Sequence, residues 1–150
     1  MWQPVLMING YLISVLGLAM LIPAAVDMLE TGRNWSLFVT SSIVSLFIGL
    51  SLFLGNRTKI EKITLQQGYL LTAVSWVSLT LLATLPFILS DVTPGFADAL
   101  FEAMSGLSTT GATVITDLEV LPDSILLWRS MLNGLGGVGT VSYTHLRAHE

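Results

Sequence analysis

Three long apolar runs without a charged residue most constrain what this chain can fold into. They extend over about Val5 to Val26, Trp35 to Leu54 and Gly68 to Ser90. As a helix, each run is long enough to cross roughly 30 Å of hydrocarbon. Only 11% of the 150 residues are charged, whereas soluble domains carry roughly 25%. The sequence therefore predicts an all-α polytopic membrane protein. A signal peptide is disfavoured for the first run, because no Lys or Arg precedes it.

The charged residues between the runs predict the orientation in the membrane. The segment Asp27 to Asn34 is a short polar connection, and the segment Gly55 to Thr64 is the basic connection, with Arg57, Lys59 and Lys62 against Glu61. Positively charged loops stay in the cytoplasm. Two crossings precede the basic loop, so we expect a cytoplasmic N-terminus and an outer position for Asp91.

A shorter helix is predicted after the third run. Thr93 is a candidate N-cap, Pro94 suits the first helical position, and Gly106 is expected to end the helix. About 12 residues give roughly 18 Å, or half a bilayer. The run GLSTTGATV (106–114) follows, then an acidic turn, and then a stretch from Ser124 to Val141 that is long enough for a fourth span. This order predicts a re-entrant pore half-helix with a filter loop, because irregular backbone at membrane depth must lie inside protein or beside water.

Acidic residues gather on the predicted outer side. Among loop cations only Arg33 opposes them there. An acidic vestibule would concentrate cations, and an ordinary solvated loop surface is the alternative. The acidic residues concerned are Asp27, Glu30, Asp91, Asp98, Glu102, Asp117, Glu119 and Asp123.

Two glycine-rich patterns resemble phosphate-binding motifs but lack their context. GLSTTGAT (106–113) has P-loop spacing, yet Ala112 replaces the lysine and no strand precedes it. GLGGVG (134–139) follows an apolar helical stretch and favours close helix packing through small residues. For residues 108–113 we favour a cation pathway, in which backbone carbonyls replace the ion's water shell. A Ser/Thr-rich helix-packing segment is the alternative.

Arg129 is a charge within the predicted fourth span, which makes it a candidate functional residue. A structural ion pair with Glu102 or Asp123 is the favoured interpretation. Glu102 also follows Asp98 by four residues, an unfavourable spacing for like charges on a helix. We expect Glu102 and Arg129 to support the filter loop.

The stretch FEAMSGLSTTGATV (101–114), followed by LLWRSMLNGLGGVGTV (126–141), resembles the first pore repeat of the Trk/Ktr/HKT superfamily of potassium transporters, TrkH-type subunits in particular. The resemblance implies four span–pore-loop–span repeats around one pore, with Gly111 as the key glycine of this repeat. It implies that carbonyls of Thr109, Thr110, Gly111 and Ala112 line one quarter of a potassium filter.

Further expectations concern the whole protein. The resemblance implies potassium uptake across the bacterial cytoplasmic membrane, passive or coupled, by a homodimer bound to cytosolic nucleotide-binding regulatory subunits. We expect potassium as the substrate, no covalent cofactor and no nucleic-acid partner. A non-transporting scaffold or sensor with an interfacial half-helix is the alternative. An enzyme is disfavoured, because the chain has no Cys and its two His both lie near the C-terminus.

The chain is predicted to comprise three parts. Residues 1–64 form two leading transmembrane helices and the basic loop, and residues 65–141 form one pore repeat. Since a pore needs four repeats, the chain is either a fragment or a subunit of an assembly. Residues 142–150, SYTHLRAHE, are abruptly polar and predict a foreign tail, in which His145 and His149 do not make a convincing metal site.

Overall fold

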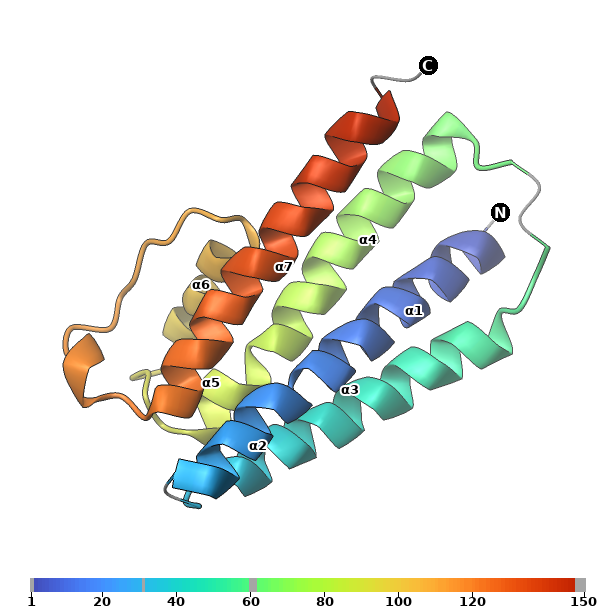
Figure 1. The fold of residues 1–150 in the computed structure, drawn as a ribbon. Coiled ribbons are helices and arrows are strands. Elements are labelled where there is room, and N and C mark those ends of the chain that lie inside the picture. Colours follow the sequence, from blue (N-terminus) through green and yellow to red (C-terminus); the bar gives the residue numbers. More distant parts are fainter. Residues whose placement is uncertain (1, 31, 60–61, 148–150) are drawn as a thin grey trace. The chain divides into compact units, whose positions relative to one another are not determined.

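The computed structural model describes residues 2–30, 32–59 and 62–147, and the regular structure in these ranges is helical, without a β-strand (Figure 1). The chain divides into two compact units, Met1–Leu82 and Ala83–Glu150. Three helices in the described part of the chain are long and apolar enough to cross a membrane: Trp2–Glu30, Trp35–Gly55 and Leu65–Leu89. The predicted all-helical membrane fold is confirmed.

The first of these helices is interrupted near its middle. α1 (Trp2–Ala19) and α2 (Leu21–Glu30) are separated at Met20, three residues before Pro23. Proline lacks the N–H of the helical ladder and crowds the preceding turn, which explains the break. α2 continues to Glu30, so the helix includes part of the segment predicted as a polar connection. This is possible because buried Asp27 accepts the Asn34 N–H through Oδ2 at 2.7 Å.

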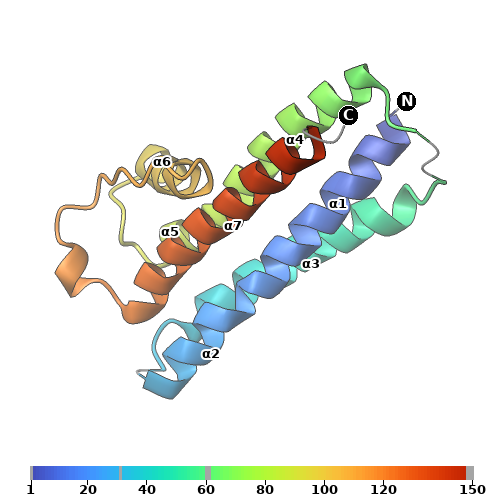
Figure 2. The ribbon, with the colours of Figure 1, turned by 45° about the horizontal axis from the view of Figure 1, so that its top comes forward.

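α1 packs antiparallel against α3 (Trp35–Gly55), as both ribbon views show (Figure 2). The contact is made through small residues. A Cβ on Gly10 would lie 2.7 Å from the Gly49 carbonyl oxygen, so the two backbones nearly touch. The Ser42 hydroxyl donates a hydrogen bond to the Gly17 carbonyl at 2.7 Å. Such close approach is the usual way for helices to associate in lipid, where apolar side chains gain little from leaving the bilayer.

α4 (Leu65–Ala83) begins with a reciprocal capping box. The Thr64 N–H donates to Gln67 Oε1 at 3.0 Å, and the Gln67 N–H donates to Thr64 Oγ1 at 3.3 Å. α4 is linked to α1 by the Ser78 hydroxyl, which donates to buried Asn9 Oδ1 at 2.9 Å. The helix breaks at Thr84 and continues as α5 (Leu85–Leu89), which carries a proline in its first turn.

The second unit is built on α6 (Phe96–Leu107) and α7 (Asp123–Arg147), with the short 3₁₀ helix η1 (Leu118–Val120) between them. α6 has the predicted length of 12 residues, but its N-cap is Gly95 and not Thr93. The predicted start at Thr93 and Pro94 is therefore wrong by two residues. Gly95 takes the extended cap conformation, and Asp98 then lies in the first turn, where a negative charge stabilises a helix.

α7 corresponds to the predicted fourth span and has 25 residues. It is not among the three helices that are apolar enough to cross a membrane. Arg129, Asn133 and four glycines lower its hydropathy, so a fourth crossing stays a prediction. The helix continues to Arg147, through most of the segment interpreted as a foreign tail, while residues 148–150, including His149, lie outside the described residues.

Candidate functional site

The C-terminus of α6 ends in a Schellman turn. Ser108 is the C-cap, and the Thr109 N–H donates to the Gly106 carbonyl at 2.9 Å. The Thr110 N–H donates to the Ser105 carbonyl at 3.0 Å. These bonds reverse the chain immediately after the half-helix, so the helix ends one residue beyond Gly106.

Two residues of the predicted filter stretch have left-handed backbone. Thr109 has a φ of 59° and Gly111 a φ of 73°. Glycine adopts this conformation without steric cost, but a β-branched residue is a genuine outlier there. A Cβ on Gly111 would meet no atom of the chain within 4 Å. The requirement for glycine at this position therefore comes from the backbone angle and not from crowding within the chain.

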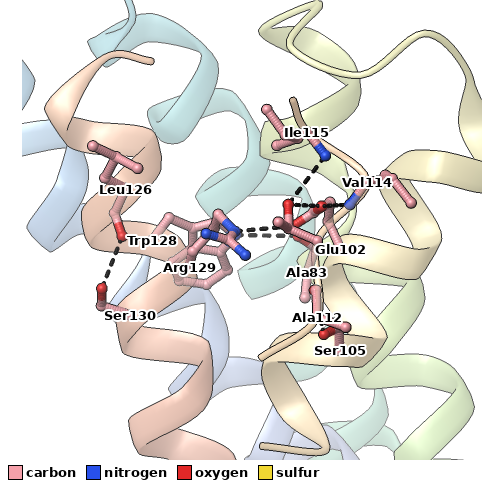
Figure 3. A network of polar contacts seen from close by, with 11 residues as sticks. Ala83, Glu102, Ser105, Ala112, Val114, Ile115, Leu126, Trp128, Arg129 and Ser130 are labelled. Atoms are coloured by element: carbon pink, nitrogen blue, oxygen red, sulfur yellow. Dashed lines mark hydrogen bonds and ion pairs between the residues drawn. The ribbon is translucent and has the colours of Figure 1, made fainter. Parts of the chain in front are cut away.

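After this turn the chain runs back beside α6, held by the Glu102 carboxylate (Figure 3). The Thr113 hydroxyl and the Val114 N–H both donate to Glu102 Oε1, at 2.5 and 2.8 Å. Glu102 is 1% exposed. One buried carboxylate in the middle of α6 thus fixes the far end of the segment that contains Thr109 to Ala112.

The other carboxylate oxygen of Glu102 binds α7. Arg129 Nε lies 2.9 Å from Glu102 Oε2, and the two side chains point toward one another (Figure 3). The structure therefore contains the ion pair that was favoured for Arg129, and the partner is Glu102. The guanidinium also offsets the unfavourable spacing of Glu102 and Asp98, so no cation is required to do so.

α6 and α7 also meet through glycine, at two levels. A Cβ on Gly106 would lie 2.8 Å from Leu132 Cβ, and one on Gly136 would clash with the Leu107 carbonyl oxygen. The packing interpretation of GLGGVG is thus confirmed at Gly136. At Gly134 and Gly139 a Cβ would meet nothing within 4 Å among the described residues, so packing there stays a prediction.

Ser105 holds the predicted filter stretch through hydrogen bonds, and sequence reasoning missed it. Its hydroxyl donates to the Ala112 carbonyl at 2.6 Å. Its own carbonyl accepts the N–H groups of Thr110 and Gly111, at 3.0 and 3.3 Å. A serine in an apolar helix gives no periodic signal that could have revealed this role. The Ala112 carbonyl, predicted as a filter ligand, already accepts one hydrogen bond from within the chain.

The predicted acidic cluster is smaller than the sequence suggests. Asp27 and Glu102 are buried and hydrogen-bonded within the fold. In the second unit, Asp98 is half-buried and the exposed acidic residues are Asp91, Asp117, Glu119 and Asp123. Among the described residues no group of three or more His, Cys, Asp or Glu could hold a metal ion. The chemistry available at Thr109 to Ala112 is therefore that of backbone carbonyls and hydroxyls.

The described geometry combines a half-length helix, a left-handed turn and a returning segment. The sequence of the chain is similar to those of known proteins. The family model of TrkH, described as cation transport protein, matches residues 35–148. The chain belongs to the TrkH family. This confirms the resemblance seen in the sequence.

Relatives of the TrkH family match most of the chain. The Trk system potassium uptake protein TrkH of Halomonas elongata is 36% identical over 138 residues, covering 91% of this chain and 29% of that protein. The Trk system potassium uptake protein TrkG of Escherichia coli is 31% identical over 133 residues, covering 88% of this chain and 27% of that protein. The chain thus spans less than a third of the length of these relatives. Their names are those of transport proteins, which confirms that the chain is not an enzyme.

A solved TrkH structure has the same fold. The crystal structure of the potassium transporter TrkH from Vibrio parahaemolyticus superimposes with a TM-score of 0.87 at 35% identity, covering 93% of this chain and 30% of that one. Together with the three apolar helices, family membership shows that this TrkH-family chain is a multi-pass membrane protein.

Proposed function

We propose that the chain is the N-terminal part of a potassium-uptake subunit and contributes one quarter of its ion filter. Residues 65–141 would form the first pore repeat, preceded by two leading helices, and residues 142–150 would be foreign to it. The names of the relatives support potassium as the substrate. No covalent chemistry is required, because the filter would act by replacing the water shell of the ion.

The observation that carries this proposal is the left-handed turn after a 12-residue helix. At about 1.5 Å per residue, α6 covers roughly half a bilayer, so its C-terminal end would lie at membrane depth as a re-entrant element. That end carries the negative pole of the helix dipole. Thr109 to Ala112 begin at this pole, where exposed backbone oxygens would face a cation favourably.

The resemblance to the wider superfamily supports the remaining features of the proposal. They comprise three further repeats in the complete transporter, a homodimer, and a cytosolic nucleotide-binding regulatory subunit. The basic residues Arg57, Lys59 and Lys62 support a cytoplasmic position for the loop and the N-terminus. The membrane would then be the bacterial inner membrane.

The test is the substitution Gly111→Ser in the complete transporter, expressed in a host that requires potassium uptake. A serine is strained at a φ of 73°, at a cost of roughly 1–2 kcal/mol for a left-handed non-glycine residue. The carbonyls on either side should re-aim, so discrimination between potassium and sodium should fall by about tenfold. Competitive uptake of the two ions measures this.

The matched control is Gly134→Ser, the same substitution where a Cβ meets nothing within 4 Å. It should leave selectivity unchanged. If Gly111→Ser assembles and keeps the wild-type selectivity, the filter assignment is wrong. Absence of ion uptake by the complete wild-type protein would favour a scaffold or sensor instead.

A further inference from the structure

We propose that Ser105 is a positioning residue that holds the backbone of the filter stretch in its ion-coordinating conformation. This inference rests on the proposed function of Thr109 to Ala112 and goes beyond it, since Ser105 does not itself belong to the stretch. It stands on three observations: a hydroxyl that bonds across the turn, a shared carbonyl and a strained backbone.

The Ser105 hydroxyl bonds across the turn that follows α6 and not within its own helix. A serine or threonine within a helix commonly donates to the carbonyl four residues earlier. Examples in this chain, at 2.8 to 3.0 Å, are Ser14, Thr40, Ser41, Thr72 and Ser130. Ser105 instead donates forward, to the Ala112 carbonyl seven residues later, at 2.6 Å. Its hydroxyl therefore spans the turn instead of satisfying its own helix.

The Ser105 carbonyl completes the contact from the other side. It accepts the N–H groups of Thr110 and Gly111, at 3.0 and 3.3 Å. Three hydrogen bonds thus join Ser105 to three consecutive residues of the stretch. Ser105 is 6% exposed, whereas Thr110, Gly111 and Ala112 are exposed, so the bonds anchor an exposed stretch to a buried residue of α6.

The backbone between these bonds needs such restraint. Thr109 and Gly111 both have left-handed φ angles, and Thr109 is β-branched, so its conformation persists only where the surroundings over-determine it. The Glu102 carboxylate holds the chain only from Thr113 onward. Among the hydrogen bonds described here, only those of Ser105 reach both the middle of the stretch, at Thr110 and Gly111, and its end at Ala112.

The position of the Ala112 carbonyl follows from this arrangement. Its oxygen accepts the Ser105 hydroxyl, so one of its two lone pairs is already occupied. Without the hydroxyl, this carbonyl is free to rotate and the stretch loses its fixed spacing. Ion selectivity should then decline, because the distances between coordinating oxygens are no longer held.

The experiment is Ser105→Ala in the complete transporter, with potassium and sodium uptake measured in competition. The backbone carbonyl of residue 105 keeps its contacts in this variant, so only the hydroxyl is removed. A single hydrogen bond of this kind accounts for roughly two- to tenfold in an equilibrium. We expect the potassium-to-sodium uptake ratio to fall by a factor in that range, while the amount of assembled protein in the membrane stays near that of the wild type.

Two further variants separate positioning from packing. Ser105→Thr keeps the hydroxyl and should retain most of the selectivity. Ser105→Cys keeps the shape of the side chain with a somewhat larger atom that is a weaker donor, and should give an intermediate ratio. Ser130→Ala is the matched control, because it removes an exposed hydroxyl that bonds within its own helix at 3.0 Å. It should leave the ratio unchanged.

Several outcomes would overturn the inference. One is a wild-type ratio in an assembled Ser105→Ala or Ser105→Cys variant. Another is a loss of assembly in both, which would assign Ser105 to folding and not to selectivity. A wild-type transporter that takes up no potassium would instead contradict the proposed function itself, so the two failures are distinguishable.

Discussion

Glu102 combines two separate tasks in one buried carboxylate. Oε1 accepts the Thr113 hydroxyl and the Val114 N–H, while Oε2 pairs with Arg129. The first set of bonds fixes the returning segment, and the second ties α6 to α7. Removing one partner of a buried ion pair leaves an uncompensated charge, which typically costs roughly 3–5 kcal/mol. The two tasks can be separated by substitution, because a positive residue at position 102 could restore the pair but could accept no hydrogen bond.

We therefore predict that Glu102→Arg and Arg129→Glu each abolish assembly, and that the double variant restores it in part. The restored protein should show weaker potassium selectivity than the wild type, because Thr113 and Val114 have lost their acceptor. The amount of protein in the membrane and the potassium-to-sodium uptake ratio measure the two effects. A double variant that assembles no better than the single variants would argue against the pair, and one with full selectivity would argue against the acceptor role.

The contacts of Glu102 could be predicted from the sequence only in part. The pair with Arg129 could be predicted, because a lone charge in an apolar helix needs a partner and few candidates exist. The bonds of Glu102 to Thr113 and Val114 could not, since they depend on how tightly the chain turns at Thr109. Ser105 was missed for the same reason: its partner lies across a turn whose left-handed residue is a threonine, a position where glycine is expected.

At the scale of elements, α6 is held to α7 by contacts that leave no room for a side chain at position 106 or 136. The Leu107 carbonyl lies against Gly136, and Leu132 lies against Gly106. The length of α6 was predictable from the spacing between the start signals at Thr93 and Pro94 and the small polar run that begins at Gly106. Its start was not, because Thr93 and Gly95 are both acceptable N-caps and only the fold decides between them. The interruption at Met20 follows from Pro23, which lies within the apolar run Val5 to Val26 that was predicted as one span.

We predict that Gly136→Ala destabilises the protein while Gly134→Ala does not. A Cβ at position 136 would clash with the Leu107 carbonyl oxygen, so α6 and α7 would have to separate. Overpacking of this kind costs roughly 1–3 kcal/mol. At position 134 the same methyl group meets nothing within 4 Å and should stabilise the helix by up to about 1 kcal/mol.

Thermal unfolding of the complete transporter in detergent provides the measurement for this pair. The Tm of Gly136→Ala should fall below that of the wild type, and the Tm of Gly134→Ala should equal or exceed it. Equal Tm values for the two variants would mean that α6 and α7 are not in close contact at Gly136 in the assembled protein.

At the scale of the whole molecule, the proposed function requires one orientation in the membrane. If the basic loop after α3 is cytoplasmic, α4 leads to the outer side, and the half-helix enters from there with the cation. The returning segment then leads back to η1 on the outer side. The apolar helices alone do not decide this, since their pattern is the same in either direction. Only the placement of charges in the loops does so.

The absence of cysteine from the chain makes this orientation directly measurable. Lys59→Cys lies in the basic loop, and Val120→Cys lies in η1, where Val120 is 82% exposed. In intact cells that express an otherwise cysteine-free transporter, a membrane-impermeant maleimide should label Val120→Cys. It should label Lys59→Cys only after the cells are permeabilised. The opposite pattern would place the half-helix on the cytoplasmic side, where it could not receive incoming cations. Labelling of both sites in intact cells would mean that α4 does not cross the membrane, which would remove the first span of the proposed pore repeat.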